Sequence, residues 1–164
     1  MPAFRFTIRH LTASLFATGL LFASASAHAE DSSVKRRLDD RGLKYTVDGD
    51  GDFKVTYNYA KENRTQLVFV SGSALSVGGF QVREVFSPAG KISKDGINGA
   101  KALELLTESR KNKLGSWEIA GDLLYFVIKL PDTVNAGELE SAMDIAAQTA
   151  DDMEVKLSGS RDDL

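Results

Sequence analysis

The chain has 164 residues, no cysteine and only two histidines, His10 and His28. The absence of cysteine excludes disulfides, cysteine nucleophiles and zinc sites built from thiolates. Acidic residues outnumber basic ones by 23 to 20, which argues against nucleic-acid binding because phosphate recognition needs a concentrated basic surface. With 43% hydrophobic and 26% charged residues, the composition is typical of a folded globular domain.

The N-terminal segment, residues 1–29, has the three parts of a secretory signal peptide in order. Residues 1–10 contain two arginines and no acidic residue, and residues 11–22 form an apolar run. Small residues follow and end in an A-x-A pattern at Ala29, so we expect cleavage between Ala29 and Glu30. The apolar run is shorter than the about 20 residues that span a bilayer, so no stable membrane anchor is expected.

Cleavage at this point would leave residues 30–164 as a mature chain in the periplasm or outside the cell. Two of the 20 basic residues and none of the 23 acidic residues precede Glu30, so the mature chain has 18 basic and 23 acidic residues. Both histidines are lost with the leader, which excludes a Ser-His-Asp triad. A chain of this length is expected to form a single domain.

The mature chain begins with a predicted short helix, residues 32–42, capped by Ser32 or Ser33 and ended by Gly42. Residues 43–59 predict a hairpin, because an Asp-Gly-Asp-Gly-Asp turn separates two strands. The second of these strands alternates apolar and polar residues and carries Tyr57 and Tyr59 on its apolar face.

Two further strands precede the next helix. Residues 66–71 are apolar on both faces, as in a central strand. Residues 72–80 are small and glycine-rich, which indicates a loop or an irregular edge. Residues 81–86 alternate again, and we expect Pro88 and Gly90 to end that strand.

The C-terminal half is predicted to contain a helix over residues 97–112 and a short strand over 116–120, which holds the only tryptophan, Trp117. Residues 123–130 form the most apolar strand, which we place at the centre of the sheet. A last helix, residues 136–158, begins with a capping box.

The last helix carries apolar residues at alternating spacings of four and three, a one-sided stripe. We expect the stripe to pack on the sheet; a helix–helix seam in a dimer is the alternative. Its members are Leu139, Met143, Ala146, Ala150, Met153 and Leu157.

The predicted order is α-β-β-β-β-α-β-β-α. Strands joined by tight turns favour a mainly antiparallel sheet, and helices kept apart from the strand runs give an α+β fold with helices packed against that sheet.

Charged motifs have ordinary structural interpretations. The Asp48–Asp52 turn lacks the Gly and Glu of a calcium-binding loop at the required positions, so we interpret it as a hairpin turn, with weak calcium binding as the alternative. The basic run Lys35–Arg37 is interpreted as a solvated helix face. The acid pairs at 39–40, 151–152 and 162–163 are interpreted as surface carboxylates, although facing pairs would allow acid–base hydrolysis.

The order and the residue patterns of several segments together resemble one family. They are VDGDGDFKV (47–55), TQLVFVSG (65–72), VREVFSPAGKI (82–92), ALELLTESRKNKLGSWEI (102–119) and AQTADDMEVKLSGSRDD (147–163). This pattern looks like the YbjN-like family, whose fold is similar to that of type III secretion chaperones.

The resemblance implies helices against an antiparallel sheet, and often a homodimer. Type III chaperones hold an extended partner chain without catalysis or nucleotide, and YbjN-like proteins are described as sensory-transduction or stress regulators. The resemblance carries over no catalytic residue, so no enzyme activity, cofactor or metal site is expected. A secretion signal sets this chain apart from type III chaperones, which work in the cytoplasm.

The first hypothesis is therefore a non-catalytic periplasmic or secreted protein that binds another protein or a second copy of itself. The residues proposed for the contact surface are Tyr57, Tyr59, Trp117, Met143 and Met153.

The alternative hypothesis is a small-ligand carrier or sensor. The aromatic residues Phe53, Tyr57, Tyr59 and Trp117 would then line a cavity between a helix and the sheet. A third hypothesis, an acid-pair hydrolase, needs two carboxylates that face each other across a cleft.

Overall fold

The structure is a computed structural model that describes residues 31–159, 161–162 and 164. The expected signal peptide and its cleavage point, Ala29–Glu30, lie outside the described residues. The elements are α1 (Ser32–Asp40), β1 (Tyr45–Val47), β2 (Phe53–Tyr59), β3 (Arg64–Val70), β4 (Leu75–Val77), β5 (Phe80–Lys91), α2 (Gly99–Ser109), β6 (Ser116–Ala120), β7 (Leu123–Pro131) and α3 (Ala136–Ser158).

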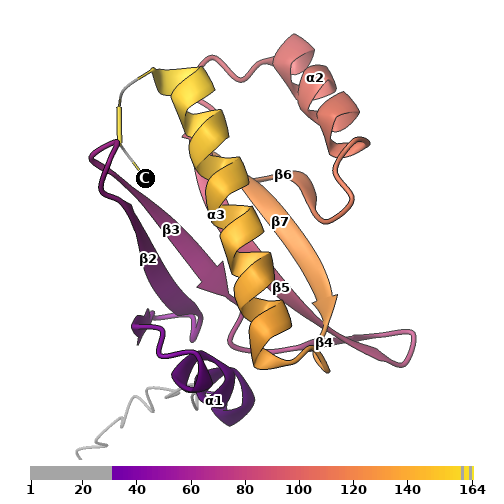
Figure 1. Ribbon diagram of the computed structural model, residues 1–164. Helices are drawn as coiled ribbons and strands as arrows, with labels where there is room; N and C mark the ends of the chain where they lie inside the picture. The colour runs from indigo at the N-terminus through magenta and orange to yellow at the C-terminus, as the bar shows by residue number, and fades with distance from the viewer. Residues whose placement is uncertain (1–30, 160, 163) are drawn as a thin grey trace, which may run out of the picture.

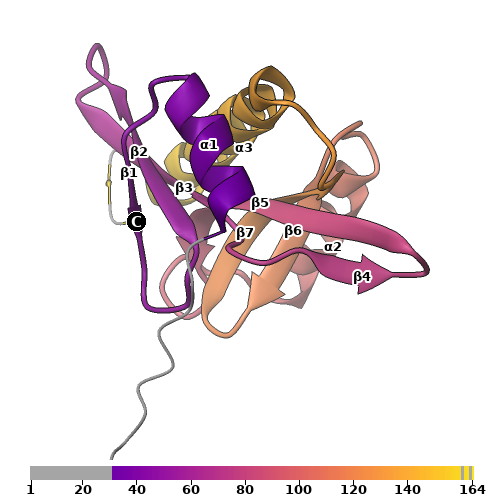
Figure 2. The same cartoon turned by 90° about the horizontal axis from the view of Figure 1, so that it is seen from below.

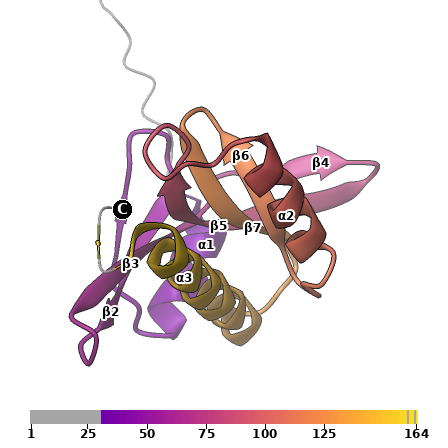
Figure 3. The same cartoon turned by 90° about the horizontal axis from the view of Figure 1, so that it is seen from above.

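A seven-stranded antiparallel sheet forms one layer, in the order β1-β2-β3-β5-β7-β6, with β4 paired to β5. The helices form the second layer: α3 crosses the front of the sheet (Figure 1), and α2 lies beside it (Figure 3). The predicted α+β fold is confirmed. None of the helices in the described residues is both long and apolar enough to cross a membrane.

The glycine-rich residues 72–80 were expected to form either a loop or an irregular edge. They are not a loop, because they contain β4 and the turn that joins it to β5. Gly78 and Gly79 both have positive φ, +56° and +88°. A two-residue turn with two such residues matches the twist of a hairpin. Five strands therefore precede α2, one more than predicted.

The strand β5 is twice as long as predicted and runs through Pro88 to Lys91. Its pairing with β7 shifts register between Pro88 and Gly90. Such a bulge accommodates a residue without a backbone N–H inside a sheet. The expectation that Pro88 and Gly90 end the strand is therefore wrong.

The first helix is capped by Asp31, not by Ser32 or Ser33. The Asp31 carboxylate accepts hydrogen bonds from the backbone N–H groups of Ser33 and Val34, at 2.8 and 3.2 Å. An ionised carboxylate at this end of a helix also interacts favourably with the helix dipole.

The last helix coincides with the predicted range 136–158, and the capping box of Asn135 and Glu138 is present. The apolar stripe packs on the sheet, as expected. Five of its six members are at most 5% exposed, so the alternative use of this stripe as a dimer seam is wrong: Leu139, Met143, Ala146, Ala150 and Met153.

A buried ion network joins α1 to the sheet. The Arg83 side chain is only 1% exposed and binds Asp132 and Asp31, with N–O distances of 2.6 and 2.8 Å. Arg37 binds the same Asp132 at 2.9 Å and is itself buried. The expectation that the whole Lys35–Arg37 run faces solvent is therefore wrong for Arg37.

A second buried ion network holds the end of α3. Arg64 on β3 binds Asp151 at 2.9 Å and Glu154 at 2.8 Å, and all three residues are at most 8% exposed. The interpretation of Asp151 as a surface carboxylate is therefore wrong. Its charge is used to fix the helix to the sheet.

Candidate functional site

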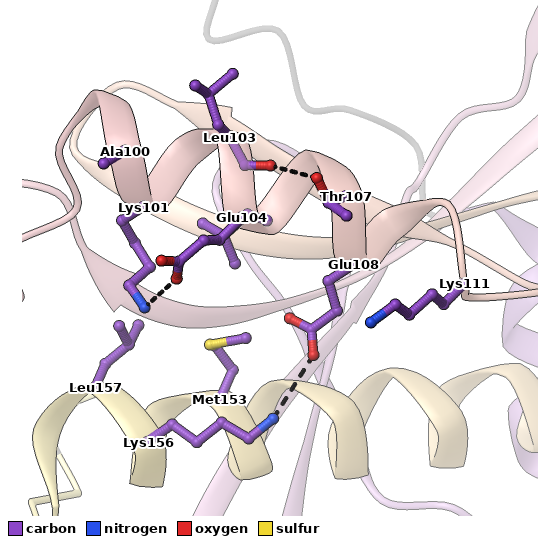
Figure 4. Close-up of a pocket in the computed structure, with 11 residues that line it drawn as sticks. Ala100, Lys101, Leu103, Glu104, Thr107, Glu108, Lys111, Met153, Lys156 and Leu157 are labelled. Carbon is purple, nitrogen blue, oxygen red and sulfur yellow. Dashed lines mark hydrogen bonds and ion pairs between the residues drawn. The ribbon is translucent and has the colours of Figure 1, made fainter.

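The helix α2 exposes two large apolar side chains. Leu105 is buried, whereas Leu103 and Leu106 are 66% and 63% exposed. Successive residues of an α-helix are rotated by about 100°, so Leu103 and Leu105 point to nearly opposite sides. Figure 4 shows the Leu103 side chain directed away from α3. One leucine therefore anchors α2, and the other two form an uncovered apolar face.

A groove of about 560 Å³ lies between α2 and α3 (Figure 4). Its apolar side chains include Leu105 from α2 and Met153 and Leu157 from α3. Charged side chains of both signs lie around them, and two pairs interact: Lys101 with Glu104 at 2.7 Å, and Lys156 with Glu108 at 3.7 Å.

The edge strand β6 continues the surface beside α2. It pairs with β7 on one side and is the last strand of the sheet. The backbone N–H of Trp117 donates to Ser109 Oγ at 2.9 Å, which links β6 to the end of α2. Ile119, two residues further along the same face of the strand, is 52% exposed. We call Leu103, Leu106, Ile119 and the outer edge of β6 beyond Trp117 the α2–β6 surface.

The two tyrosines of the predicted contact surface lie on β2 and are half-buried. The Tyr57 hydroxyl donates to Asp144 Oδ1 on α3, at 2.8 Å. Burial, followed by the nearby carboxylate of Asp151, raises the pKa of Tyr59 to about 12. Both tyrosines therefore pack at the border between the sheet and α3.

The other three predicted contact residues belong to the core. Met143 is fully buried and Met153 is 5% exposed, because both lie on the stripe that faces the sheet. Trp117 is 6% exposed and packs edge-on against Phe126 at 5.0 Å between ring centres. The expectation that these three side chains form an exposed contact surface is wrong, and only Met153 reaches the α2–α3 groove.

The aromatic residues of the carrier hypothesis do not line one cavity. Tyr57 lies on β2 and Trp117 on β6, with β3, β5 and β7 between these strands. Four strand spacings of about 4.8 Å separate them by roughly 19 Å. Phe53 is fully buried and packs edge-on against Tyr45 at 5.3 Å. This version of the carrier hypothesis is wrong.

The Asp48–Asp52 segment is a hairpin turn, as predicted. The Asp48 carboxylate accepts hydrogen bonds from the backbone N–H groups of Asp50 and Asp52, each at 3.0 Å. Within the part of the chain that the structure describes, no group of three or more His, Cys, Asp or Glu side chains is arranged to hold a metal ion.

The predicted helix over residues 97–112 does not by itself show which of its leucines are exposed, so the α2–β6 surface was not predicted. Three leucines within four residues cannot share one face of a helix. The spacing of these leucines therefore indicates, from the sequence alone, that at least one of them faces solvent. The exposure of Ile119 had no such signal, because it depends on β6 being an edge strand.

Comparison with known proteins identifies the fold. No family model and no curated protein matches the chain. One chain of the structure of the HopA1–SchA chaperone–effector complex superposes with a TM-score of 0.52 at 8% identity, covering 73% of this chain and 88% of that one.

A second match is the crystal structure of the Yersinia pestis type III secretion chaperone SycH in complex with a stable fragment of YscM2. Its TM-score is 0.51 at 15% identity, covering 79% of this chain and all of that one. The fold is that of type III secretion chaperones. At these identities the likeness establishes the fold alone.

Proposed function

We propose that this protein binds a segment of another protein on the α2–β6 surface and performs no catalysis. The observation that carries the proposal is the uncovered pair Leu103 and Leu106 on a helix whose one buried residue is Leu105. Large apolar side chains that stand together outside the core are typical of interaction sites. Both matched structures are complexes of a chaperone with a protein partner, which supports this use of the fold.

The geometry indicates the kind of segment. A helix with an apolar stripe could cover Leu103 and Leu106, and an extended segment could add to the edge of β6 beyond Trp117. The partner segment therefore needs an apolar face.

The proposal also includes the compartment in which the protein acts and its regulatory role. The leader pattern in residues 1–29 supports action in the periplasm or outside the cell. Asp31, two residues after the expected cleavage point, is the first described residue and already caps α1. We also propose membership of the YbjN-like family, a regulatory role in sensing or stress, and self-association as a homodimer.

Paired substitutions test the binding surface. The tagged mature chain would be compared with the double variant Leu103→Asp/Leu106→Asp in affinity capture from periplasmic extract. The captured protein would then be purified and titrated directly. We expect the double variant to bind at least tenfold more weakly while its urea midpoint is unchanged, because both side chains are exposed.

Substitution of Thr56 and Asn58, exposed uncharged residues of β2, by Asp adds the same two negative charges away from these leucines and is the matched control. This control is expected to bind as the native chain does. Equal binding by the native chain and the leucine variant would refute the α2–β6 surface as the site.

A second candidate function is carriage of a small ligand in the α2–α3 groove. Its volume of about 560 Å³ lies within the range of small-molecule sites. Native mass spectrometry of the purified protein tests this, since a carrier should retain a ligand of defined mass and lose it in Leu157→Glu, a change at a half-buried residue of the groove. Unliganded mass in every preparation would contradict it.

A further inference from the structure

A second groove runs along α3 on the side of β7. Its larger part, about 490 Å³, lies beside the first turns of α3, and its smaller part, about 240 Å³, lies further along the helix. Leu114 and Ile145 line both parts, so the two parts are continuous. The turn from β7 into α3 forms one end, and Figure 2 shows this turn from below. We call this cleft the α3–β7 groove.

The middle of the α3–β7 groove is apolar. Phe126 and Leu130 of β7 are buried beneath it, at most 9% exposed. Leu114, from the segment after α2, and Ile145, from α3, stand at its rims and are 47% and 39% exposed. An apolar ligand lying between these two rims would remove both side chains from water, which favours its binding.

The length of the groove indicates the size of such a ligand. Its lining residues on α3 run from Gly137 and Glu138 to Thr149 and recur every three or four positions, so they share one face of the helix. From Glu138 to Thr149 the helix rises by about 17 Å. An extended alkyl chain advances about 1.25 Å per carbon, so about 13 carbons span this distance.

The polar groups at the two ends of the groove differ in their partners. Beside the β7–α3 turn, Asn135 and Glu138 satisfy each other in the capping box, through hydrogen bonds of 2.8 and 3.0 Å. At the other end, Asn112 Nδ2 has no hydrogen-bond acceptor among the described residues. Lys113 beside it makes no ion pair in the same part of the chain. An amide N–H and an ammonium group together favour a negatively charged acceptor at this end.

We propose that the α3–β7 groove binds a fatty acid of about 12–14 carbons, with its carboxylate at Asn112 and Lys113 and its alkyl chain directed toward the β7–α3 turn. A peptide segment fits less well, because its backbone N–H and C=O groups would find no partners along the apolar middle. This inference concerns a site distinct from the α2–β6 surface and from the α2–α3 groove, and it does not rest on the proposed function.

Fluorescence of the only tryptophan tests the binding. Trp117 packs edge-on against Phe126, which lines the groove, with ring centres 5.0 Å apart. Dodecanoate added to the mature chain should change the Trp117 emission and saturate at one molecule per chain, well below the concentration at which dodecanoate forms micelles. Absence of a saturable change, or a change that appears only with micelles, would overturn the proposal.

A pair of matched variants locates the site. Ile145→Glu places a charge in the apolar middle and should weaken dodecanoate binding at least tenfold. Val155→Glu makes the same kind of change at a residue of α3 that is 42% exposed and does not line this groove, and it should bind as the native chain does. Both variants should keep the native urea midpoint. Equal binding by Ile145→Glu and the native chain would contradict the assignment.

The head group is tested by comparing dodecanoate with 1-dodecanol, which has the same alkyl chain and no charge. Lys113→Gln should weaken binding of the acid about fivefold and leave binding of the alcohol unchanged. Equal effects on both ligands would overturn the placement of the carboxylate. Leu103→Asp/Leu106→Asp should bind dodecanoate as the native chain does, so failure of the proposed partner site and failure of this groove are distinguishable.

Discussion

Arg83→Met should destabilise the fold strongly, although it removes no apolar contact. Arg83 is 1% exposed, and its guanidinium binds Asp132, Asp31 and the carbonyl oxygen of Ser71. Methionine fills much of the volume but leaves these acceptors without their donor. Removing one member of a buried ion pair costs about 3–5 kcal/mol.

Two features of the structure make the expected loss of stability smaller than about 3–5 kcal/mol. The side chains of Asp31 and Asp132 are 25% and 24% exposed, so water can solvate them in part. Asp132 also keeps Arg37, and Asp31 keeps its bonds to the first turn of α1. We therefore expect a loss of about 2–3 kcal/mol in the free energy of unfolding.

Urea unfolding followed by circular dichroism measures the loss. With a slope of about 1.5 kcal/mol per molar urea, the midpoint should fall by about 1.3–2 M. Arg36→Met, on the exposed side of α1, should shift the midpoint by less than about 0.3 M. An equally small shift for Arg83→Met would show that the network adds little stability and would refute this reasoning.

Three further predictions concern pH and glycine. Hydrogen bonds from Arg83 lower the pKa of Asp132. Burial raises the pKa of Asp31, but the hydrogen bonds from Arg83 and from the backbone N–H groups of Val34 and Ser33 together lower it below its usual value. Stability should therefore fall as pH drops below about 4, and fall less in Arg83→Met. Burial raises the pKa of Tyr59 to about 12, so stability should decrease as pH rises from about 10 to 12, and Tyr59→Phe should reduce that decrease. Urea midpoints across both pH ranges check these two, and parallel curves for variant and native chain would contradict them. Gly115→Ala should cost about 3 kcal/mol, because φ is +82° and the new methyl would lie 2.7 Å from a buried aromatic ring. Gly121→Ala, with φ +59° and open space, should cost only about 1–2 kcal/mol; equal losses would argue against the steric cause.

Features determined by neighbouring residues were predictable. The helix α3 matched its predicted range because Asn135 and Glu138 form a cap that is local in sequence, and its stripe repeats over about five turns. The Asp48–Asp52 turn was predictable for the same reason, since its side-chain hydrogen bonds span only a few residues.

Features that depend on distant partners were not predictable. Arg83 is buried because Asp132 and Asp31 approach it from 49 and 52 positions away. The strand β5 passes Pro88 because β7 accepts a bulge there. The sequence does not show whether Trp117 is exposed, because its burial depends on the packing of α2 beside β6.

The sparse burial of α2, in which Leu105 is the one buried residue, also has a consequence for its motion. Burial of one leucine contributes about 2 kcal/mol, whereas α3 buries a whole stripe. Local opening of α2 should therefore require much less free energy than unfolding of the sheet, and its amides should exchange with deuterium faster than those of α3. A partner that docks on Leu103 and Leu106 would order this helix and slow the exchange, which makes α2 a built-in reporter of binding.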